Sequence, residues 1–230
     1  MHEELRVRVL EMNLSIEAEG LVFQTWGNAS AIDREQGVIA IKPSGVAYAD
    51  LTADSIVVVD LEGRHVYGKL APSVDLPTHL MIYRGFHEVG AVVHAHSHFA
   101  TVFAQARRPI PCLGTTHADY FNGEIPLIPA PDHDEITLGY ERAIGDLIVR
   151  HFINRDPLEC PAALCAGHGP FIWGRTPRQA VENAVVLEEL AAMAFHTMLL
   201  NPAAPVLENH LLNKHFLRKH GKDAYYGQKG

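Results

Sequence analysis

Two histidines with one residue between them, His94 and His96, follow an apolar run at residues 91–93. The run is rich in β-branched residues and predicts a buried strand. Because residues two apart on a strand face the same side, we expect both imidazoles to point together from a rigid backbone. Histidine is the commonest metal-ligating side chain, so this spacing predicts half of a divalent metal site. His98 would face the same side as His94 and His96 but lies at the strand end, so we expect it to contact the metal ligands and not the metal itself. A merely solvated, histidine-rich strand end is the alternative.

A second segment offers the third ligand that a pair of imidazoles lacks. His168 follows a small apolar run at residues 162–166, and Gly167 and Gly169 flank it. Glycines on both sides let the backbone come close to a bound ion. Asp75 could add a carboxylate as a fourth ligand, or act as a base beside the metal. A turn histidine without a ligand role is the alternative for His168.

Two turns at the ends of predicted strands carry small polar residues and glycine. The first contains Gly27 and Asn28, and the second contains Lys42, Ser44 and Gly45. Exposed backbone N–H groups, a hydroxyl and one lysine would suit a phosphate group. Two ordinary β-turns are the alternative. The chain has no Walker-type loop and no G-x-G-x-x-G motif, which argues against a nucleotide site.

The composition is ordinary for a soluble globular protein, and the sequence contains no internal repeat or interior linker, so we expect one domain over residues 1–230. The net charge of −8 does not resemble a basic nucleic-acid surface, so no nucleic-acid partner is expected. No apolar run approaches the ~20 residues of a membrane span, and the N-terminus lacks the apolar core of a signal peptide. Three cysteines without a C-x-x-C pair (Cys112, Cys160 and Cys165) suit a reducing cytoplasm.

The elements that must position these residues follow from periodicity and turn signals. An amphipathic helix over residues 5–18, ended by Gly20, precedes a meander of antiparallel strands at 21–26, 29–33, 38–42 and 55–61. Further strands are expected at 110–113, 162–166 and 171–174, and helices at 77–87, 99–106, 134–151, 176–200 and 211–220. Ser97 and Thr176 are predicted helix caps, and residues 114–121 a loop. Glu188 and Glu189 are expected on a solvated face or at a contact between subunits.

Several longer motifs resemble the class II aldolase/adducin family. They are Pro72-x-x-Asp75-x-Pro77-Thr78-His79, His94-x-His96-Ser97 and Gly167-His168-Gly169-Pro170. The run at 115–121 and the ending at 213–221 with 224–227 are similar to the sugar-phosphate epimerases of that family. The resemblance covers nearly the whole chain. It implies a three-layer α/β/α fold around a largely antiparallel central sheet, and a homotetramer with active sites between adjacent subunits.

The same resemblance implies a role for each candidate residue. Zn²⁺, or another divalent ion such as Mn²⁺ or Co²⁺, would be held by three histidines and an aspartate: His94, His96, His168 and Asp75. Phosphate would be bound by residues of the two turns and of a third segment: Gly27, Asn28, Lys42, Ser44, Gly45, Ser73 and Val74. Asp119 and Tyr226 would come from the neighbouring subunit as the proton-transfer pair.

The implied activity interconverts L-ribulose 5-phosphate and D-xylulose 5-phosphate, a step shared by L-arabinose and L-ascorbate catabolism. The C4 proton of the substrate is not acidic, so breaking and re-forming the C3–C4 bond is the better route to inversion. A metal would act as a Lewis acid on the resulting enediolate. Asp119 and Tyr226 on opposite sides would serve the two orientations of the C4 oxygen.

Two departures and three alternatives accompany the resemblance. Val74 stands where these epimerases often have Ser, and His98-Phe99 stands where Arg or Thr followed by His is expected. An L-fuculose-phosphate-type aldolase would release the aldehyde, and Asp75 in place of Glu argues against it. A non-catalytic adducin-like module predicts a broken metal set, whereas this one is intact. A cupin needs a Glu soon after His96, yet the next is Glu124.

Overall fold

The structure, a computed structural model, describes residues 1–222 and 224–225. These residues form an eight-stranded sheet with the strand order β4-β3-β2-β1-β5-β8-β7-β6. The strands are β1 (Asn28–Asp33), β2 (Val38–Ile41), β3 (Val57–Asp60), β4 (His65–Tyr67), β5 (Ala91–His94), β6 (Leu127–Ile128), β7 (Ala162–Cys165) and β8 (Pro170–Gly174). Neighbouring strands are antiparallel except β6 and β7, which are parallel. The sheet is therefore mixed and largely antiparallel, as predicted.

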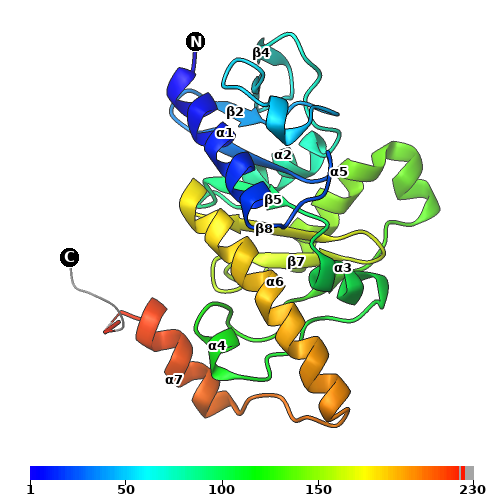
Figure 1. Cartoon of the computed structure of the whole chain (residues 1–230), viewed down its shortest axis with the longest axis vertical. Helices are drawn as coiled ribbons and strands as arrows, with labels where there is room; N and C mark the ends of the chain where they lie inside the picture. The colour runs from blue at the N-terminus through cyan, green and yellow to red at the C-terminus, as the bar shows by residue number, and fades with distance from the viewer. Residues whose placement is uncertain (223, 226–230) are drawn as a thin grey trace.

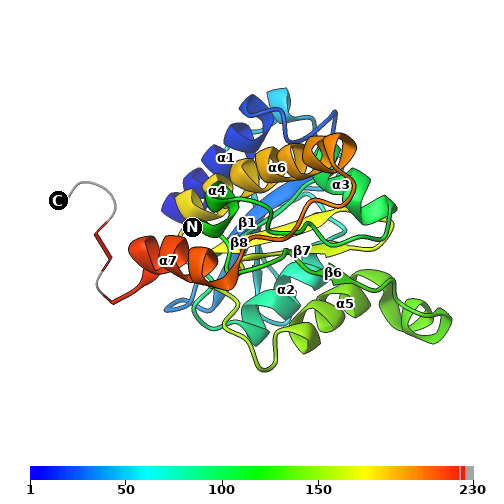
Figure 2. The same cartoon turned by 90° about the horizontal axis from the view of Figure 1, so that it is seen from below.

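Helices cover both faces of this sheet (Figures 1 and 2). Helices α1, α3 and α6 lie on one face, and α2 and α5 lie on the other and pack against each other. Their bounds are α1 (Glu3–Ala18), α2 (Leu76–Gly85), α3 (His98–Gln105), α4 (Thr115–Ala118), α5 (His133–His151), α6 (Pro177–Leu200) and α7 (Asn209–His220), with a short 3₁₀ helix η1 (Tyr48–Asp50). α4 and α7 pack together at the end of the molecule away from β4 (Figure 1).

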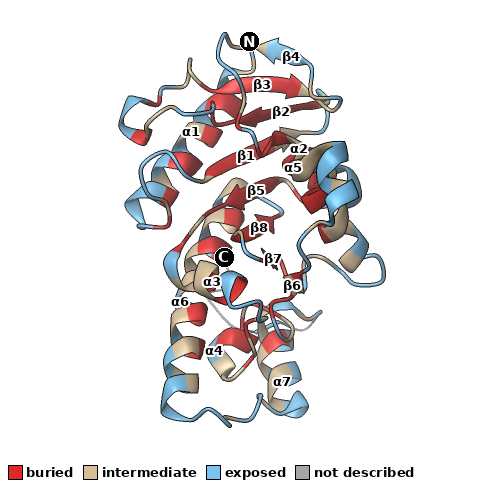
Figure 3. Cartoon of the chain, turned by 90° about the vertical axis from the view of Figure 1, so that its right-hand side faces the viewer, coloured by how far each residue is buried: buried red, intermediate tan, exposed pale blue. Residues whose placement is uncertain are grey.

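The central strands are largely buried because helices cover both faces of the sheet. All four residues of β2, β5 and β7 are buried, and Figure 3 shows this buried layer in red. β5 lies between β1 and β8, so His94 faces Asn28 on one neighbour and Phe171 on the other. The sheet core therefore fixes the backbone from which His94 projects.

The strand predicted at residues 21–26 is wrong. α1 ends as expected, with Gly20 in the left-handed region (φ 69°) and Leu21 N–H donating to the Ile16 carbonyl. The following residues then turn, and Trp26 N–H donates to the carbonyl of Phe23 at 3.1 Å. The reason is tertiary: β1 already pairs with β2 and β5, which leaves no free edge beside it for another strand.

Five other expectations need correction. β5 ends at His94, so His96 lies just beyond the strand. The strand at 110–113 is reduced to a single bridge between Ile110 and Ile125, and the loop at 114–121 contains α4. Ser97 precedes α3 as predicted but makes no side-chain cap, and His98 is exposed.

Helix α6 has the predicted start and end. The Thr176 hydroxyl accepts a hydrogen bond from the Gln179 N–H, which confirms the cap. The Gln179 side chain accepts from the Arg175 N–H, so only half of a capping box forms. Among the described residues, α6 is the one helix long and apolar enough to cross a membrane by length and composition. Here it packs against α1, α3, β5 and β8.

Candidate metal centre

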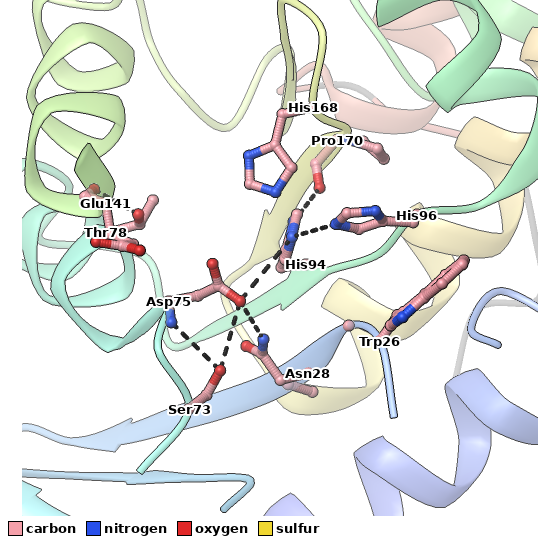
Figure 4. A network of polar contacts seen from close by, with 12 residues as sticks. Trp26, Asn28, Ser73, Asp75, Thr78, His94, His96, Glu141, His168 and Pro170 are labelled. Carbon is pink, nitrogen blue, oxygen red and sulfur yellow. Dashed lines mark hydrogen bonds and ion pairs between the residues drawn. The ribbon is translucent and has the colours of Figure 1, made fainter. Parts of the chain in front are cut away.

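Three imidazoles converge at the centre of the sheet (Figure 4). His94 ends β5, His96 follows two residues later, and His168 lies in the turn between β7 and β8. One ring nitrogen from each histidine lies within 4.8 Å of the others. The Nε2 atoms of His94 and His96 are 3.1 Å apart. Two nitrogens at about 2.05 Å from one tetrahedral zinc ion would be separated by about 3.3 Å, so the spacing fits such an ion.

The hydrogen bonding of His94 directs one lone pair into this cluster. Its Nδ1 lies 2.9 Å from the carbonyl oxygen of Pro170. A carbonyl only accepts hydrogen bonds, so Nδ1 carries the proton and Nε2 is left with a free lone pair. The ring of Phe171 stacks on the imidazole at a centroid distance of 4.1 Å and an angle of 13°. These two contacts fix the tautomer and the orientation that His94 needs as a metal ligand.

The histidines are held in the form that binds metals. Burial lowers the pKa of His94, His96 and His168 below the usual value, which keeps all three rings neutral near pH 7. Metal binding requires a neutral imidazole, so no proton has to be displaced. The donor set therefore suits a divalent cation.

Asp75 lies at the edge of the histidine cluster, just before α2. Its Oδ2 is 4.0 Å from His94 Nε2 and accepts hydrogen bonds from Asn28 Nδ2 at 2.8 Å and Ser73 Oγ at 3.4 Å. Burial alone would raise the pKa of this carboxyl, but His94, His79 and the Asn28 amide hold it below its usual value. The carboxylate is ionised and held where it can ligate a metal or take a proton beside it.

A cavity of about 370 Å³ joins the histidines to the predicted phosphate turns. Its lining includes all eleven residues predicted for the metal and the phosphate: Gly27, Asn28, Lys42, Ser44, Gly45, Ser73, Val74, Asp75, His94, His96 and His168. Backbone hydrogen bonds hold two phosphate segments together, from Ser44 N–H to Ala71 at 2.9 Å and from Ser73 N–H to Lys42 at 3.0 Å. Residues far apart in the sequence thus form one site.

Lys42 is the one lysine of this cavity. Its side chain is almost fully buried, and Nζ donates to the carbonyl of Val46 at 2.8 Å. Nζ also lies 4.8 Å from the centre of the Tyr48 ring. Burial lowers the pKa of the ammonium group. A buried cation with a single carbonyl partner retains donors for an anion.

The cavity also contains residues that the sequence reasoning missed. Thr25, Trp26 and Pro43 complete the lining, and the Tyr140 hydroxyl lies 3.4 Å from Nδ1 of His168. The wrongly predicted strand at 21–26 ended at Trp26, which received no role in binding. Gly27 follows it and needs a positive φ, and this could have indicated that Trp26 lies in a turn beside the site. A β-carbon on Gly27 (φ 76°) would lie 2.8 Å from the His94 carbonyl oxygen.

The structure does not bring Asp119 to this cavity. Asp119 follows α4, and Arg218 of α7 binds its carboxylate with two hydrogen bonds of 2.9 and 2.6 Å. Nδ1 of His215 lies 3.1 Å from the same carboxylate. Burial alone would raise the pKa of Asp119, but the hydrogen bonds of Arg218 and His215 hold it below its usual value. Tyr226, the other predicted proton-transfer residue, lies outside the described residues.

Comparisons with known proteins agree with this fold. Residues 7–195 match the Class II Aldolase and Adducin N-terminal domain. The chain is 48% identical over 227 residues to the L-ribulose-5-phosphate 4-epimerase UlaF of Salmonella paratyphi B (strain ATCC BAA-1250 / SPB7), covering 99% of this chain and 100% of that protein.

Two solved structures have the same fold. An L-fuculose 1-phosphate aldolase superposes with a TM-score of 0.80 at 23% identity, over 92% of this chain and 94% of its own. The L-fuculose-1-phosphate aldolase of Thermus thermophilus gives 0.66 at 27% identity, over 88% and 100%.

Proposed function

The chain belongs to the class II aldolase and adducin family, and from that premise we propose that it interconverts L-ribulose 5-phosphate and D-xylulose 5-phosphate. The reaction breaks the C3–C4 bond and re-forms it on the other face of the aldehyde. The observation that carries the proposal is the single cavity in which the histidine cluster meets two phosphate-type turns. The substrate is taken from the 48% identical epimerase.

His94, His96 and His168 would hold a divalent ion, with Asp75 at its edge. Imidazole suits Zn²⁺, Mn²⁺ and Co²⁺, so the ligand types leave the choice among them to availability. When bound, the ion would supply Lewis-acid stabilisation of the negative charge that forms on substrate oxygens as the C3–C4 bond breaks. Neutral imidazoles leave the full charge of the ion available for this purpose.

The two turns would hold the phosphate group throughout the reaction. Lys42 contributes the positive charge, and the Gly45 N–H group and the Ser44 hydroxyl contribute hydrogen bonds, with Gly27 and Ser73 beside them in the lining. Asn28 and Val74 complete this part of the lining. Holding the phosphate keeps the fragments together and makes re-formation of the bond an intramolecular step.

The proton-transfer pair would be completed by a second copy of the chain. Asp119 does not line the cavity of its own chain, so this carboxylate would reach the substrate only from a neighbour. That requirement supports a homotetramer with active sites between adjacent subunits, in which Asp119 and Tyr226 serve the two orientations of the C4 oxygen.

The remaining parts of the proposal concern the whole chain. Residues 1–230 would form one domain in a three-layer α/β/α arrangement, which the helices on both faces of the sheet support. The three cysteines are free and buried, which supports a cytoplasmic location. The product is common to L-arabinose and L-ascorbate catabolism, and either route is compatible with the site.

A product assay on metal-reconstituted protein tests the function. L-Ribulose 5-phosphate is supplied, and D-xylulose 5-phosphate and free glycolaldehyde phosphate are measured together. We expect D-xylulose 5-phosphate as the main product. Release of glycolaldehyde phosphate as the main product would make the protein an aldolase. Absence of both products with metal bound would contradict the proposed substrate.

A further inference from the structure

Trp26 is a large aromatic side chain left half exposed in the cavity. The indole is 53% exposed, whereas Trp173, the other tryptophan of the chain, is fully buried. Its ring lies beside the metal-ligand candidate His96, at a centroid distance of 6.1 Å and an angle of 43° (Figure 4). Its ring centroid also lies 5.7 Å from that of Phe23. The ring therefore forms a wall of the site instead of filling the core.

The backbone that carries this ring is held at several points. The hydroxyl of buried Tyr48 lies 3.0 Å from the carbonyl oxygens of both Trp26 and Gly27 and donates to them. The Trp26 N–H donates to Phe23, and Gly27 packs against the His94 carbonyl. Because the backbone is fixed against the ligand strand, the position of the wall is fixed as well.

Trp26 differs chemically from most of the cavity lining. Asn28, Lys42, Ser44 and Asp75 offer hydrogen-bond donors or acceptors to a bound sugar phosphate. Trp26 offers a broad aromatic face, and Val74, which is 64% exposed, is the other exposed apolar residue of the lining. The cavity thus combines polar groups that bind the substrate with a broad aromatic face, which is a much weaker hydrogen-bonding surface than a hydroxyl, amide or ammonium group.

The proposed reaction needs such a surface. When the C3–C4 bond breaks, its electron pair stays with the three-carbon fragment, and the proton of the C4 hydroxyl passes to a base. The two-carbon aldehyde phosphate must then turn its carbonyl about the C–C bond before the bond re-forms and the proton returns. A side chain that bound the aldehyde carbonyl strongly would hold the aldehyde with one face toward the enediolate and prevent inversion. A gap in place of a side chain would admit water and let the aldehyde leave.

We propose that Trp26 is a specificity-determining residue that retains the cleaved aldehyde while it turns, so that the enzyme epimerises its substrate and does not release it. This inference rests on the proposed function. It assigns the difference between epimerase and aldolase behaviour partly to one aromatic side chain beside the histidine cluster. The aromatic face, and not the indole nitrogen, provides the retention.

Product partition in Trp26 variants tests the inference. Metal-reconstituted Trp26→Ala, Trp26→Phe and unchanged protein receive L-ribulose 5-phosphate, and released glycolaldehyde phosphate is measured relative to D-xylulose 5-phosphate. We expect Trp26→Ala to raise this ratio by about 10-fold or more, the effect of losing roughly 1.4 kcal/mol of retention. Trp26→Phe keeps an aromatic face and should stay within about threefold of the unchanged protein.

Ile153→Ala is the control, because Ile153 is also an exposed apolar residue but does not line the cavity. It should leave the partition ratio unchanged. An unchanged ratio in Trp26→Ala, with equal metal content, would overturn the inference and leave the proposed function intact. Absence of both products in the unchanged protein would overturn the proposed function, and the inference with it.

Fluorescence gives a readout that does not depend on turnover. Co²⁺ bound by the three histidines should quench the emission of the nearby Trp26 ring. Trp26→Phe should lose most of this quenching, because the Trp26 ring lies directly beside His96, whereas Trp173 lies two residues further along β8 than Phe171, which contacts His94. Equal quenching in Trp26→Phe and in the unchanged protein would show that Trp26 does not lie beside the ion, and would overturn the inference.

Discussion

The histidine cavity and the surroundings of Asp119 are held in place in different ways. The cavity lies at the ends of central strands, where β1, β5 and β8 are hydrogen-bonded to one another and buried. Asp119 directly follows α4 and is held by Arg218 of α7. These two helices lie at one end of the molecule (Figures 1 and 3). The candidate ligand set is assembled by the core of one chain, whereas the candidate acid or base is held by ion pairing and, under the proposed function, would reach the substrate from a second copy.

His96→Asn should have the largest effect, because it removes one of three converging nitrogens. We expect metal affinity to fall by at least about 100-fold, the upper end of what a change in the outer shell causes. Metal content after dialysis against a buffered metal solution measures this. His98→Asn is the control, since His98 is exposed and absent from the cavity lining. Equal metal content in the two variants would contradict a metal site formed by the three histidines.

Asp119→Asn should separate chemistry from metal binding. We expect turnover of L-ribulose 5-phosphate to fall by about 10²–10⁴-fold, the usual contribution of a general acid or base. Metal content should not change, because Asp119 is not part of the histidine cluster. Loss of metal in this variant would contradict the distinction between the two regions.

Mixing the two inactive variants tests whether the regions meet between subunits. When His96→Asn and Asp119→Asn chains are unfolded and refolded together in equal amounts, about a quarter of the intersubunit sites in a symmetric oligomer receive both intact residues. Turnover should therefore recover to roughly that fraction. A mixture as inactive as its components would place both residues in the same chain's site, or remove one from the mechanism.

Arg218→Ala should have a moderate effect that depends on pH. The pKa of Asp119 is lowered in the folded protein, so its ion pair stabilises the fold above the ordinary carboxyl pKa and is lost as pH falls through the lowered value. Near pH 7 we expect a loss of about 1–3 kcal/mol in the free energy of unfolding. The difference from the unchanged protein should shrink below about pH 4.

Urea unfolding at several pH values and equal protein concentration measures this difference. Arg175→Ala is the control, because Arg175 pairs with Glu88 at a largely exposed position and should contribute about 0–1 kcal/mol. A difference between Arg218→Ala and the unchanged protein that stays constant down to about pH 3 would show that the guanidinium acts by packing and not by pairing with the carboxylate.

Glu188→Ala should have the smallest effect. The Glu188 carboxylate accepts hydrogen bonds from the N–H groups of Phe99 and Ala100, at 2.7 and 3.0 Å, and so caps α3 in place of Ser97. We expect a loss of about 1 kcal/mol and a fall in Tm of about 2–4 °C. Adjacent, exposed Glu189→Ala should change Tm by much less, and equal shifts would contradict the cap.

Glu188 also shows how far the sequence could lead. A pair of glutamates on an amphipathic helix was expected on a solvated face or at a subunit contact, yet Glu188 caps another helix of the same chain. The helical period places Glu188 on a face of α6 but says nothing about which element that face meets. The free N–H groups at the start of α3 needed an acceptor, and only the packing of α3 on α6 supplied one.

The sequence by itself determined the local features of this protein: the buried strand that leads into His94, the turn at Gly27, the cap at Thr176 and the residue types of a metal site. These depend on spacing and backbone preference within a few residues. Tertiary structure decided which segments meet. It placed His168 and the phosphate turns beside β5 and left no free sheet edge for a strand at 21–26. It also brought Asp119 into contact with Arg218 of α7. Such contacts join segments that are distant in the sequence. They are determined by strand order and helix packing, and therefore cannot be predicted from local periodicity.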